Sequence, residues 1–450
     1  MTISPIAAAS PRITRGTKDN GVRTPRILRR VGGTALAVTL LAGVAAPGFA
    51  AAASTVAPQA AAGQDRPELR QAIQSIVDSG FTGMQLRVHD QRGDWAGSAG
   101  VRKLGETAKP PTDGRFRVGS VTKTFTATVV LQLVAESRVG LDAPAADYLP
   151  QFGLDRRITV RMLLQHTSGV FNFTGEYYPD GTVVPGIPSA GKEWVDNRFH
   201  TYQPDELVRF ALSKTPRFAP GTDWSYSNTN YVLARLLIEG VTGHSYADEI
   251  QRRIARPLGL SGTTAPGTRT EIQGPHAHAY YTYEDGRQPK TVDITRQNPS
   301  WISSAGEMIS TTKDLDTFVS ALLGGKLLPA PLLAEMRKAH PTSDPKSGYG
   351  LGLFLQDVGP NCGGTIVTHN GHVQGYATLM YSTLDGSRTL EASLTYVEDV
   401  AQTQAAAYLK AVDTLIKLEF CGGQTGSAAG SEARSTTPST VAPDALKGDS

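Results

Sequence analysis

The segment Arg117-Val-Gly-Ser120-Val-Thr-Lys123-Thr-Phe125 joins an extended run that ends at Gly119 to an apolar helical pattern that begins at Val121. Ser120 is therefore expected on the first turn of a helix, where unpaired backbone N–H groups favour a developing negative charge. Lys123 follows three residues later on the same helix face, so its amine can reach the Ser120 hydroxyl and take its proton. The segment predicts a serine nucleophile that is activated without a histidine triad.

The Ser-x-x-Lys spacing is weak by itself because it also begins at Ser189, Ser310 and Ser343. Those three copies lie in turn-rich or helix-capping contexts and lack the strand-to-helix junction. For Ser120 the alternative is a helix-capping serine beside a solvated lysine. Other parts of the sequence must decide between the two.

A second segment, Pro220-Gly-Thr-Asp-Trp-Ser-Tyr226-Ser-Asn228-Thr-Asn-Tyr231, is expected to form a loop just before an apolar helix. A phenol beside an ammonium can move a proton to a leaving group, and a carboxamide offers a donor and an acceptor to a substrate amide. The alternative is a buried tyrosine followed by an asparagine that caps the helix. Tyr226 and Asn228 are candidate site residues.

A third segment, His369-Asn370-Gly371-His372-Val-Gln-Gly-Tyr376, falls on a predicted strand. A glycine there lets a substrate backbone lie close against the strand edge. The alternative for Gly371 is a β-bulge.

Several common catalytic motifs are absent from the sequence. It contains no Gly-x-Ser-x-Gly, no His-Glu-x-x-His and no glycine-rich phosphate loop before a helix. His276-Ala-His278 lacks a nearby cysteine or a carboxylate at helical spacing, so loop histidines are a better interpretation than metal ligands. The sequence predicts no metal and no cofactor.

Basic residues are concentrated at the amino terminus. Residues 1–50 hold seven Lys and Arg against one acidic residue, so the net charge of +3 becomes −3 for the rest of the chain, which excludes an extended nucleic-acid surface. The basic start, the apolar run 34–46 and the small residues that follow predict a signal peptide over 1–50, with a buried helix as the alternative. We expect a secreted protein that has no membrane span after signal removal.

The remaining pattern predicts an α+β fold. A linker over 51–64 precedes a hydrolase domain over 65–421, and a disordered tail follows over 422–450. An antiparallel sheet between terminal helices is interrupted by a helical insert at about 125–290. Two cysteines in an exported chain favour one disulfide, Cys362 to Cys421. The predicted helices begin near Pro67 and Ala401, and the later strands cover 349–356, 365–369, 376–382 and 389–397.

Together, the three segments resemble the penicillin-recognising serine hydrolases, which carry Ser-x-x-Lys, Tyr-x-Asn and Lys/His-x-Gly in this order. Secreted serine D-alanyl-D-alanine carboxypeptidases and class C β-lactamases are the most similar. The resemblance implies a nucleophile at Ser120, a base at Lys123 and a proton shuttle at Tyr226. The implied substrate contacts are Asn228, His369, Asn370, Gly371 and Trp301, and the implied oxyanion hole is formed by the backbone N–H groups of Ser120 and His372.

Trp301 would form an aromatic wall of the cleft, with a core tryptophan as the alternative, and His369 would bring polar or cationic character. His166, in a His-Thr-Ser-Gly segment that is structural in this family, is left out of the site. The family's carboxylate-binding arginine and threonines are replaced here by Phe354, Asn370 and His372.

The leading functional prediction is a monomeric D-alanyl-D-alanine carboxypeptidase that acts on cell-wall peptides. A β-lactamase, a D-aminopeptidase or an esterase on the same machinery remains open, so the substrate is a small peptide, a β-lactam or an ester. A non-catalytic cell-wall binding module is the alternative of another class. The presence of both a nucleophile and its base argues against that module.

Overall fold

The computed structural model describes residues 65–178, 180–399 and 403–422. The predicted signal peptide, the linker and all but residue 422 of the predicted tail lie outside the described residues. Within these ranges, no helix combines the length and apolar character needed to cross a membrane.

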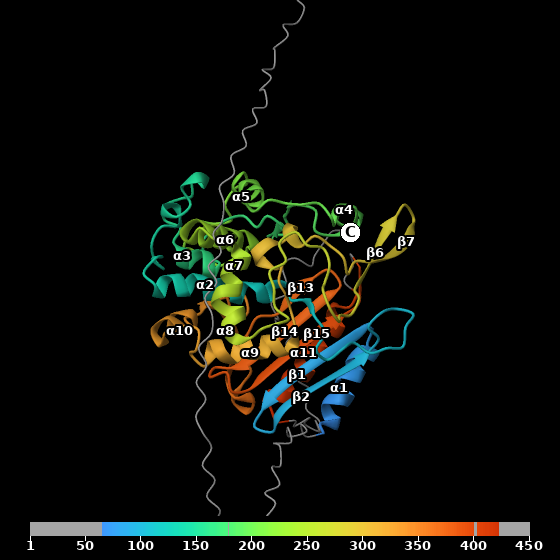
Figure 1. The fold of residues 1–450 in the computed structure, drawn as a ribbon. Helices are drawn as coiled ribbons and strands as arrows, with labels where there is room; N and C mark the ends of the chain where they lie inside the picture. Colours follow the sequence, from blue (N-terminus) through green and yellow to red (C-terminus); the bar gives the residue numbers. More distant parts are fainter. Residues whose placement is uncertain (1–64, 179, 400–402, 423–450) are drawn as a thin grey trace, which may run out of the picture. The chain divides into compact units, whose positions relative to one another are not determined.

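The centre of the described chain is a nine-stranded antiparallel sheet (Figure 1). Its strand order is β2-β1-β15-β14-β12-β11-β10-β9, and β13 pairs with β14. The strands are β1 (Gly83–Asp90), β2 (Gly93–Gly100), β9 (His340–Pro341), β10 (Ser347–Tyr349), β11 (Phe354–Asp357), β12 (Thr365–Thr368), β13 (Gly371–Val373), β14 (Tyr376–Thr383) and β15 (Thr389–Thr395). The sheet and its helices confirm the predicted α+β class.

One face of this sheet is covered by the two terminal helices, α1 (Pro67–Asp78) and α11 (Ala405–Phe420). Pro67 occupies the first helical position, where its missing N–H costs no hydrogen bond. Leu69 and Ile73 of α1 pack with Leu415 of α11 and with alternate residues of β1, β14 and β15 in one apolar cluster. The terminal helices therefore cover one face of the sheet, and of the predicted substrate contacts only the Asn370 side chain lies on this face.

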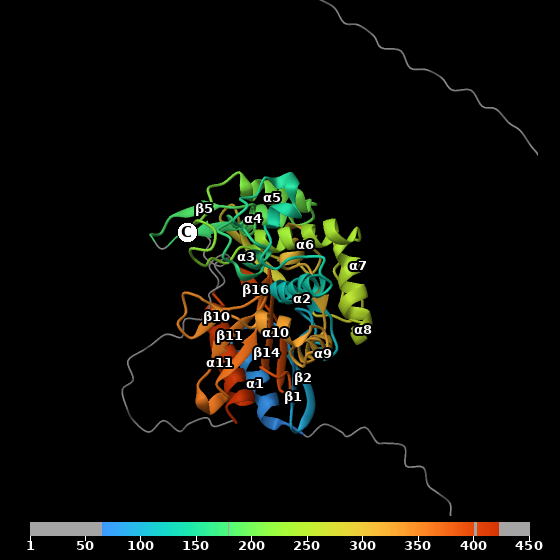
Figure 2. The ribbon, with the colours of Figure 1, turned by 90° about the vertical axis from the view of Figure 1, so that its left-hand side faces the viewer.

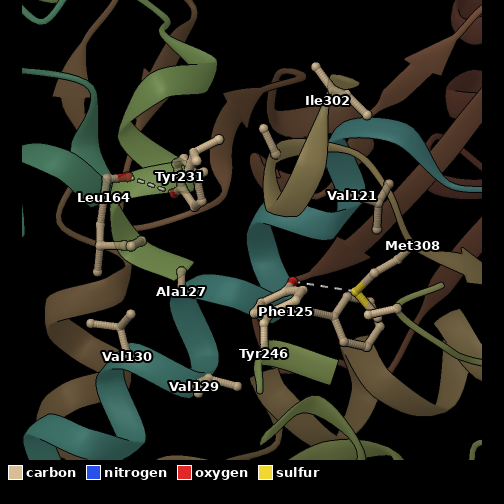
Figure 3. Packing of buried hydrophobic residues seen from close by; sticks show 14 of the residues in the cluster. Val121, Phe125, Ala127, Val129, Val130, Leu164, Tyr231, Tyr246, Ile302 and Met308 are labelled. Carbon is tan, nitrogen blue, oxygen red and sulfur yellow. Dashed lines mark hydrogen bonds between the residues drawn. The ribbon is translucent and has the colours of Figure 1, made fainter. Parts of the chain in front are cut away.

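The opposite face carries α9 (Thr312–Leu323) and a helical region that includes α2 (Thr122–Ala135), α3 (Val160–Gln165) and α6 (Asn228–Thr242). Figure 3 shows α2 in the middle of this core, with Val129 and Val130 on different sides of the helix. Phe125 stacks on Phe318 at 3.6 Å between ring centroids. Because α2 is buried almost all round, its first turn is held rigidly.

The helical region is accompanied by small sheets of two or three strands, and Figure 2 shows the helical region beyond one end of the main sheet. Strand β4 pairs with β5, β3 pairs with β8, and β6 lies between β7 and β16. The remaining elements are β3 (Phe116–Arg117), β4 (Gly175–Tyr177), β5 (Val183–Pro185), β6 (Tyr280–Asp285), β7 (Gln288–Asp293), β8 (Ile309–Ser310), β16 (Val397–Asp399), α4 (Gly191–Asn197), α5 (Pro204–Leu212), α7 (Tyr246–Ile250), α8 (Arg256–Leu258) and α10 (Ala330–Met336).

Two predicted strands are divided in the structure. The run 349–356 forms the end of β10 and most of β11, because Gly352 turns the chain with a φ of +82°. A Cβ on Gly352 would lie 2.5 Å from Ala127, so glycine also lets this turn approach α2. The run 389–397 breaks after Thr395, where the chain leaves the main sheet for β16.

The predicted disulfide is confirmed: Cys362 is bonded to Cys421. Cys362 belongs to the short turn between β11 and β12, and Cys421 follows the last residue of α11. The bond therefore fastens the end of the terminal helix to the sheet that it covers.

Candidate active site

Ser120 lies in a one-turn 3₁₀ helix, Gly119–Val121, that leads directly into α2. Its hydroxyl is at the start of this continuous helical segment, as the sequence predicts. Gly119 has a φ of +52°, and a Cβ there would lie 2.5 Å from the backbone nitrogen of His372. The tight turn thus brings the nucleophile against β13.

The Lys123 amine contacts three oxygen atoms beneath Ser120. Its Nζ lies 3.1 Å from Ser120 Oγ, 2.8 Å from Asn228 Oδ1 and 2.8 Å from the carbonyl oxygen of Ala305. The side chain is fully buried, and burial lowers its pKa well below the ordinary value. A larger fraction of Lys123 is therefore in the neutral amine form at a given pH than for an exposed lysine.

Hydrogen-bond chemistry fixes the direction of the amine's lone pair. A neutral amine has two N–H donors and one lone pair, whereas the Asn228 and Ala305 oxygens can only accept. The Asn228 amide is oriented by its own NH₂ group, which donates to Thr174 Oγ1 at 3.2 Å. With both N–H groups occupied, the lone pair of neutral Lys123 faces the Ser120 hydroxyl.

Tyr226 completes the group around the nucleophile. Its phenol forms a hydrogen bond with the Ser120 side chain, and the Lys123 Nζ lies 4.6 Å from the centre of its ring. Burial raises the pKa of Tyr226, and the Ser120 hydrogen bond only partly opposes this shift. The group is thus a neutral phenol, which can donate a proton.

Asn228 is the first residue of α6, and its side chain does not cap the helix. Its backbone N–H donates to Asn172 Oδ1 at 3.0 Å, and its amide oxygen accepts from Lys123. The structure therefore rejects the helix-capping alternative and brings Asn228 together with Ser120, Lys123 and Tyr226.

The backbone N–H groups of Ser120 and His372 come from two segments in direct contact. A Cβ on Gly371 would lie 1.9 Å from the carbonyl oxygen of Val118 and 3.1 Å from Ser120 N. Gly371 is thus required by a close backbone approach, and not by a bulge, because it pairs regularly with Thr378 of β14. Two donors on facing segments are the arrangement that an oxyanion hole needs.

His369 reaches the site region but does not bring a positive charge. Its Nδ1 donates to the Asn370 carbonyl at 2.9 Å, so Nε2 is free to accept the Tyr349 hydroxyl at 3.2 Å. Burial, together with the charge of Lys123, lowers the pKa of His369 to about 3. Phe354 packs on both rings. The prediction that His369 brings cationic character is therefore wrong, because its imidazole is neutral at physiological pH.

Two other predicted contacts need correction. The Asn370 amide donates to Tyr381 at 2.7 Å, in the cluster beneath the terminal helices, so this side chain points away from Ser120. Trp301 is 7% exposed and packs against Trp194, which favours the core alternative. The His372 imidazole lies 3.1 Å from Glu398, so the predicted role of this residue depends on its backbone N–H alone.

His166 supports the loop that carries Tyr226. Its Nδ1 accepts the Ser227 N–H at 3.2 Å, and its carbonyl accepts the Ser225 N–H at 3.0 Å. Its ring also lies 4.4 Å from the Tyr226 ring. These contacts agree with a structural role for His166, which supports the loop without taking part in the reaction.

Sequence reasoning did not identify the Ala305 carbonyl or the Tyr349 hydroxyl. A backbone oxygen gives no residue signal, because every residue carries one. Asn172 and Thr174 have no motif that would have identified them. Across the described ranges, no group of three or more His, Cys, Asp or Glu could hold a metal ion.

A buried lysine, a serine at a helix start and a neutral tyrosine define the Ser-x-x-Lys class of serine hydrolases. The sequence model of the family described as Beta-lactamase matches residues 69–398. The chain belongs to this family.

Solved structures and curated sequences give more specific similarities. The chain is 38% identical to a D-stereospecific amidohydrolase from Streptomyces sp., with a TM-score of 0.69, covering 80% of this chain and 99% of that one. A D-amino acid amidase from Ochrobactrum anthropi SV3 is 26% identical, with a TM-score of 0.65 and coverage of 78% and 98%. Penicillin-binding protein 4* of Bacillus subtilis is 28% identical over 71% of this chain and 68% of its own length.

Proposed function

We propose that this protein is a serine amidohydrolase that cleaves the amide bond following a D-amino acid residue and does not require a free carboxylate on its substrate. The neutral, aromatic surroundings of His369 are the observation that carries the proposal. The similarity to a D-stereospecific amidohydrolase supports the D-configuration of the substrate.

In the acylation step, Ser120 Oγ attacks the carbonyl carbon of the scissile amide while its proton moves to the lone pair of Lys123. The carbonyl oxygen becomes an oxyanion that the Ser120 and His372 N–H groups stabilise. As the carbon–nitrogen bond breaks, the Tyr226 phenol gives its proton to the leaving nitrogen. The Lys123 ammonium then returns a proton to Tyr226, which leaves an acyl ester on Ser120 and both bases neutral.

In the deacylation step, water attacks the ester carbon from the same side. The Tyr226 and Lys123 pair takes one proton from the water, and Ser120 regains its hydrogen as the carbon–oxygen bond breaks. The products are a free acid and the original enzyme. Asn228 holds Lys123 through its oxygen, and its amide is placed to contact the substrate backbone.

The same geometry argues against a requirement for a terminal carboxylate. A desolvated carboxylate needs a cation or several donors. Between Gly348 and His369 the chain has no lysine and no arginine. Phe354 and neutral His369 fill the corresponding place. Amides, esters and peptides with an uncharged leaving group fit this surface better.

A D-alanyl-D-alanine carboxypeptidase is the second candidate, and the similarity to a penicillin-binding protein favours it. In this second candidate function, the protein is secreted and acts on cell-wall peptides. It requires that the substrate carboxylate be held by backbone N–H groups or by hydroxyls in place of a guanidinium.

The two candidates differ in what they hydrolyse. We would measure kcat/KM for D-phenylalanine amide, its L enantiomer and an acetylated peptide that ends in D-alanyl-D-alanine. We expect the D-amide to be preferred over both others. Equal rates for the two enantiomers, or cleavage of only the peptide with a free carboxylate, would refute the proposal.

A substitution at Phe354 tests the role of the missing charge directly. Phe354→Arg should raise the ratio of kcat/KM for the free-carboxylate peptide to that for the D-amide, because it adds a cation near His369. Phe354→Met is the matched control, since it removes the ring and adds no charge. An unchanged ratio in a folded Phe354→Arg enzyme would show that this position does not select the leaving group.

A further inference from the structure

His276 and His278 lie on the same side of a short extended segment. His276 forms a β-bridge with Arg115, and the His278 N–H donates to the Arg102 carbonyl at 2.7 Å. Ala277, between them, is buried. Because alternate residues of an extended chain face the same way, both imidazoles line one open cavity of about 340 Å³.

Hydrogen bonds fix the tautomer of both rings. His276 Nδ1 lies 2.7 Å from the Gly274 carbonyl oxygen, and His278 Nδ1 lies 2.6 Å from Asp293 Oδ2. A carbonyl and a carboxylate can only accept, so each neutral ring carries its hydrogen on Nδ1 and its lone pair on Nε2. An imidazole held in this way by an oxygen acceptor is the usual form of a metal-binding histidine.

The separation of the rings also suits a shared ion. Their centroids are 5.5 Å apart, and the ring planes are tilted by 32°. Two imidazoles that bind one ion at about 2.0–2.1 Å, with an angle near 90–110° at the metal, place their centroids roughly 4.5–5.2 Å apart. A small rotation of either side chain would bring the ring centroids from 5.5 Å into this range.

Groups of both charge signs surround the cavity, and the Arg115 guanidinium lies beside Gly274. Arg102 and Lys103 also line it, but Glu106 lies 3.0 Å from the Arg102 guanidinium and 3.5 Å from the Lys103 amine. Asp293 adds a second carboxylate behind His278. An arriving cation therefore does not meet an unopposed positive patch.

We propose that His276 and His278 form a surface site for a divalent transition-metal ion, bound through both Nε2 atoms. Water fills the remaining positions. Imidazole ligands select Zn²⁺, Ni²⁺ and Cu²⁺ over Mg²⁺ and Ca²⁺. The site has two protein ligands, which agrees with the absence of any three-ligand group among the described residues. It takes no part in the Ser120 chemistry.

Copper is the sharpest probe because it binds most tightly among the divalent first-row ions. Equilibrium dialysis of the purified full chain with Cu²⁺ should show a site that His276→Gln and His278→Gln each weaken by about tenfold or more. The electron paramagnetic resonance spectrum of the bound copper should show coupling to two imidazole nitrogens in the wild type and to one in each variant.

His340→Gln is the matched control. His340 also has Nδ1 bonded to a carbonyl oxygen, at 2.7 Å, but has no neighbouring histidine ring. Its substitution should leave the copper affinity and the copper-induced rise in melting temperature unchanged. Circular dichroism establishes that each variant is folded. Copper binding that is the same in the wild type and in both cavity variants would overturn the proposal.

Discussion

At Ser120, acylation needs a base that is unprotonated near neutral pH and aimed at the hydroxyl. Lys123 meets the first condition through its burial, which disfavours the ammonium form. It meets the second because Asn228 and Ala305 take its two N–H groups. The catalytic direction of this amine is thus set by two oxygens that do not react.

Replacing Lys123 tests the need for a neutral amine. Lys123→Arg should lose activity by about 10²-fold or more at every pH, because a guanidinium does not deprotonate in proteins. The wild-type enzyme should lose activity as the pH falls through the lowered pKa of Lys123, well below the ordinary lysine range. Profiles of kcat/KM against pH measure both effects.

Lys313→Arg is the control, since Lys313 stands three residues after Ser310 and outside the site. Its profile should match that of the wild type. An active Lys123→Arg enzyme would mean that another group deprotonates Ser120.

Tyr349 donates to the Nε2 lone pair of His369, and a donor at this atom favours the neutral imidazole in addition to burial. Tyr349→Phe removes this donor, and we expect the pKa of His369 to rise from about 3 toward its ordinary value. Histidine resonances followed by NMR during a pH titration provide the measurement. Tyr381→Phe, which removes a phenol bonded to neighbouring Asn370, should leave that titration unchanged. No shift in either variant would show that burial alone controls His369.

At the scale of elements, the site depends on contact between the turn at Gly119 and strand β13. The buried helix α2 holds one side, and the pairing of β13 with β14 holds the other. Both N–H donors are backbone groups, so their positions depend on two glycines more than on any side chain.

Gly371→Ala should therefore damage the oxyanion hole. The new methyl group would overlap the Val118 carbonyl, and the two segments must separate to admit it. We expect kcat to fall by roughly 10²-fold or more, the usual effect of losing one oxyanion donor.

Gly240→Ala is the control, because Gly240 lies within α6 and its nearest contact would be at 3.8 Å. This change should preserve kcat and slightly raise stability through helix propensity. Normal kcat in Gly371→Ala would contradict the oxyanion assignment.

The sequence was informative where a side chain carries the chemistry. Ser120, Lys123, Tyr226 and Asn228 stand at fixed spacing beside predicted helix starts, and the structure brings them together. The Ala305 carbonyl could not be predicted, because any residue supplies such an oxygen. The orientation of Asn370 and the neutrality of His369 depend on tertiary burial, which a single strand pattern does not reveal.

At the scale of the whole described domain, the sheet brings together segments that are distant in sequence. Strand β1 pairs with β15, while α1 contacts α11 across the same face. The Cys362–Cys421 bond reinforces this closure, far along the chain from Ser120.

Replacing both Cys362 and Cys421 with serine should lower the free energy of unfolding by about 2–4 kcal/mol, because the bond restricts the unfolded chain. We expect kcat/KM at 25 °C to stay unchanged, since neither cysteine contacts the site residues. Denaturant unfolding with a parallel activity assay measures both quantities. Loss of activity in a folded double variant would show that the bond also positions the site.

The most direct test of the account is an acid quench during turnover of a D-phenylalanine p-nitrophenyl ester, followed by intact-mass and peptide analysis. We predict a D-phenylalanyl adduct on Ser120 in the wild type and none in Ser120→Ala, which should also lose turnover. Turnover at the wild-type rate in Ser120→Ala, or an adduct on another residue, would contradict the acyl-enzyme mechanism.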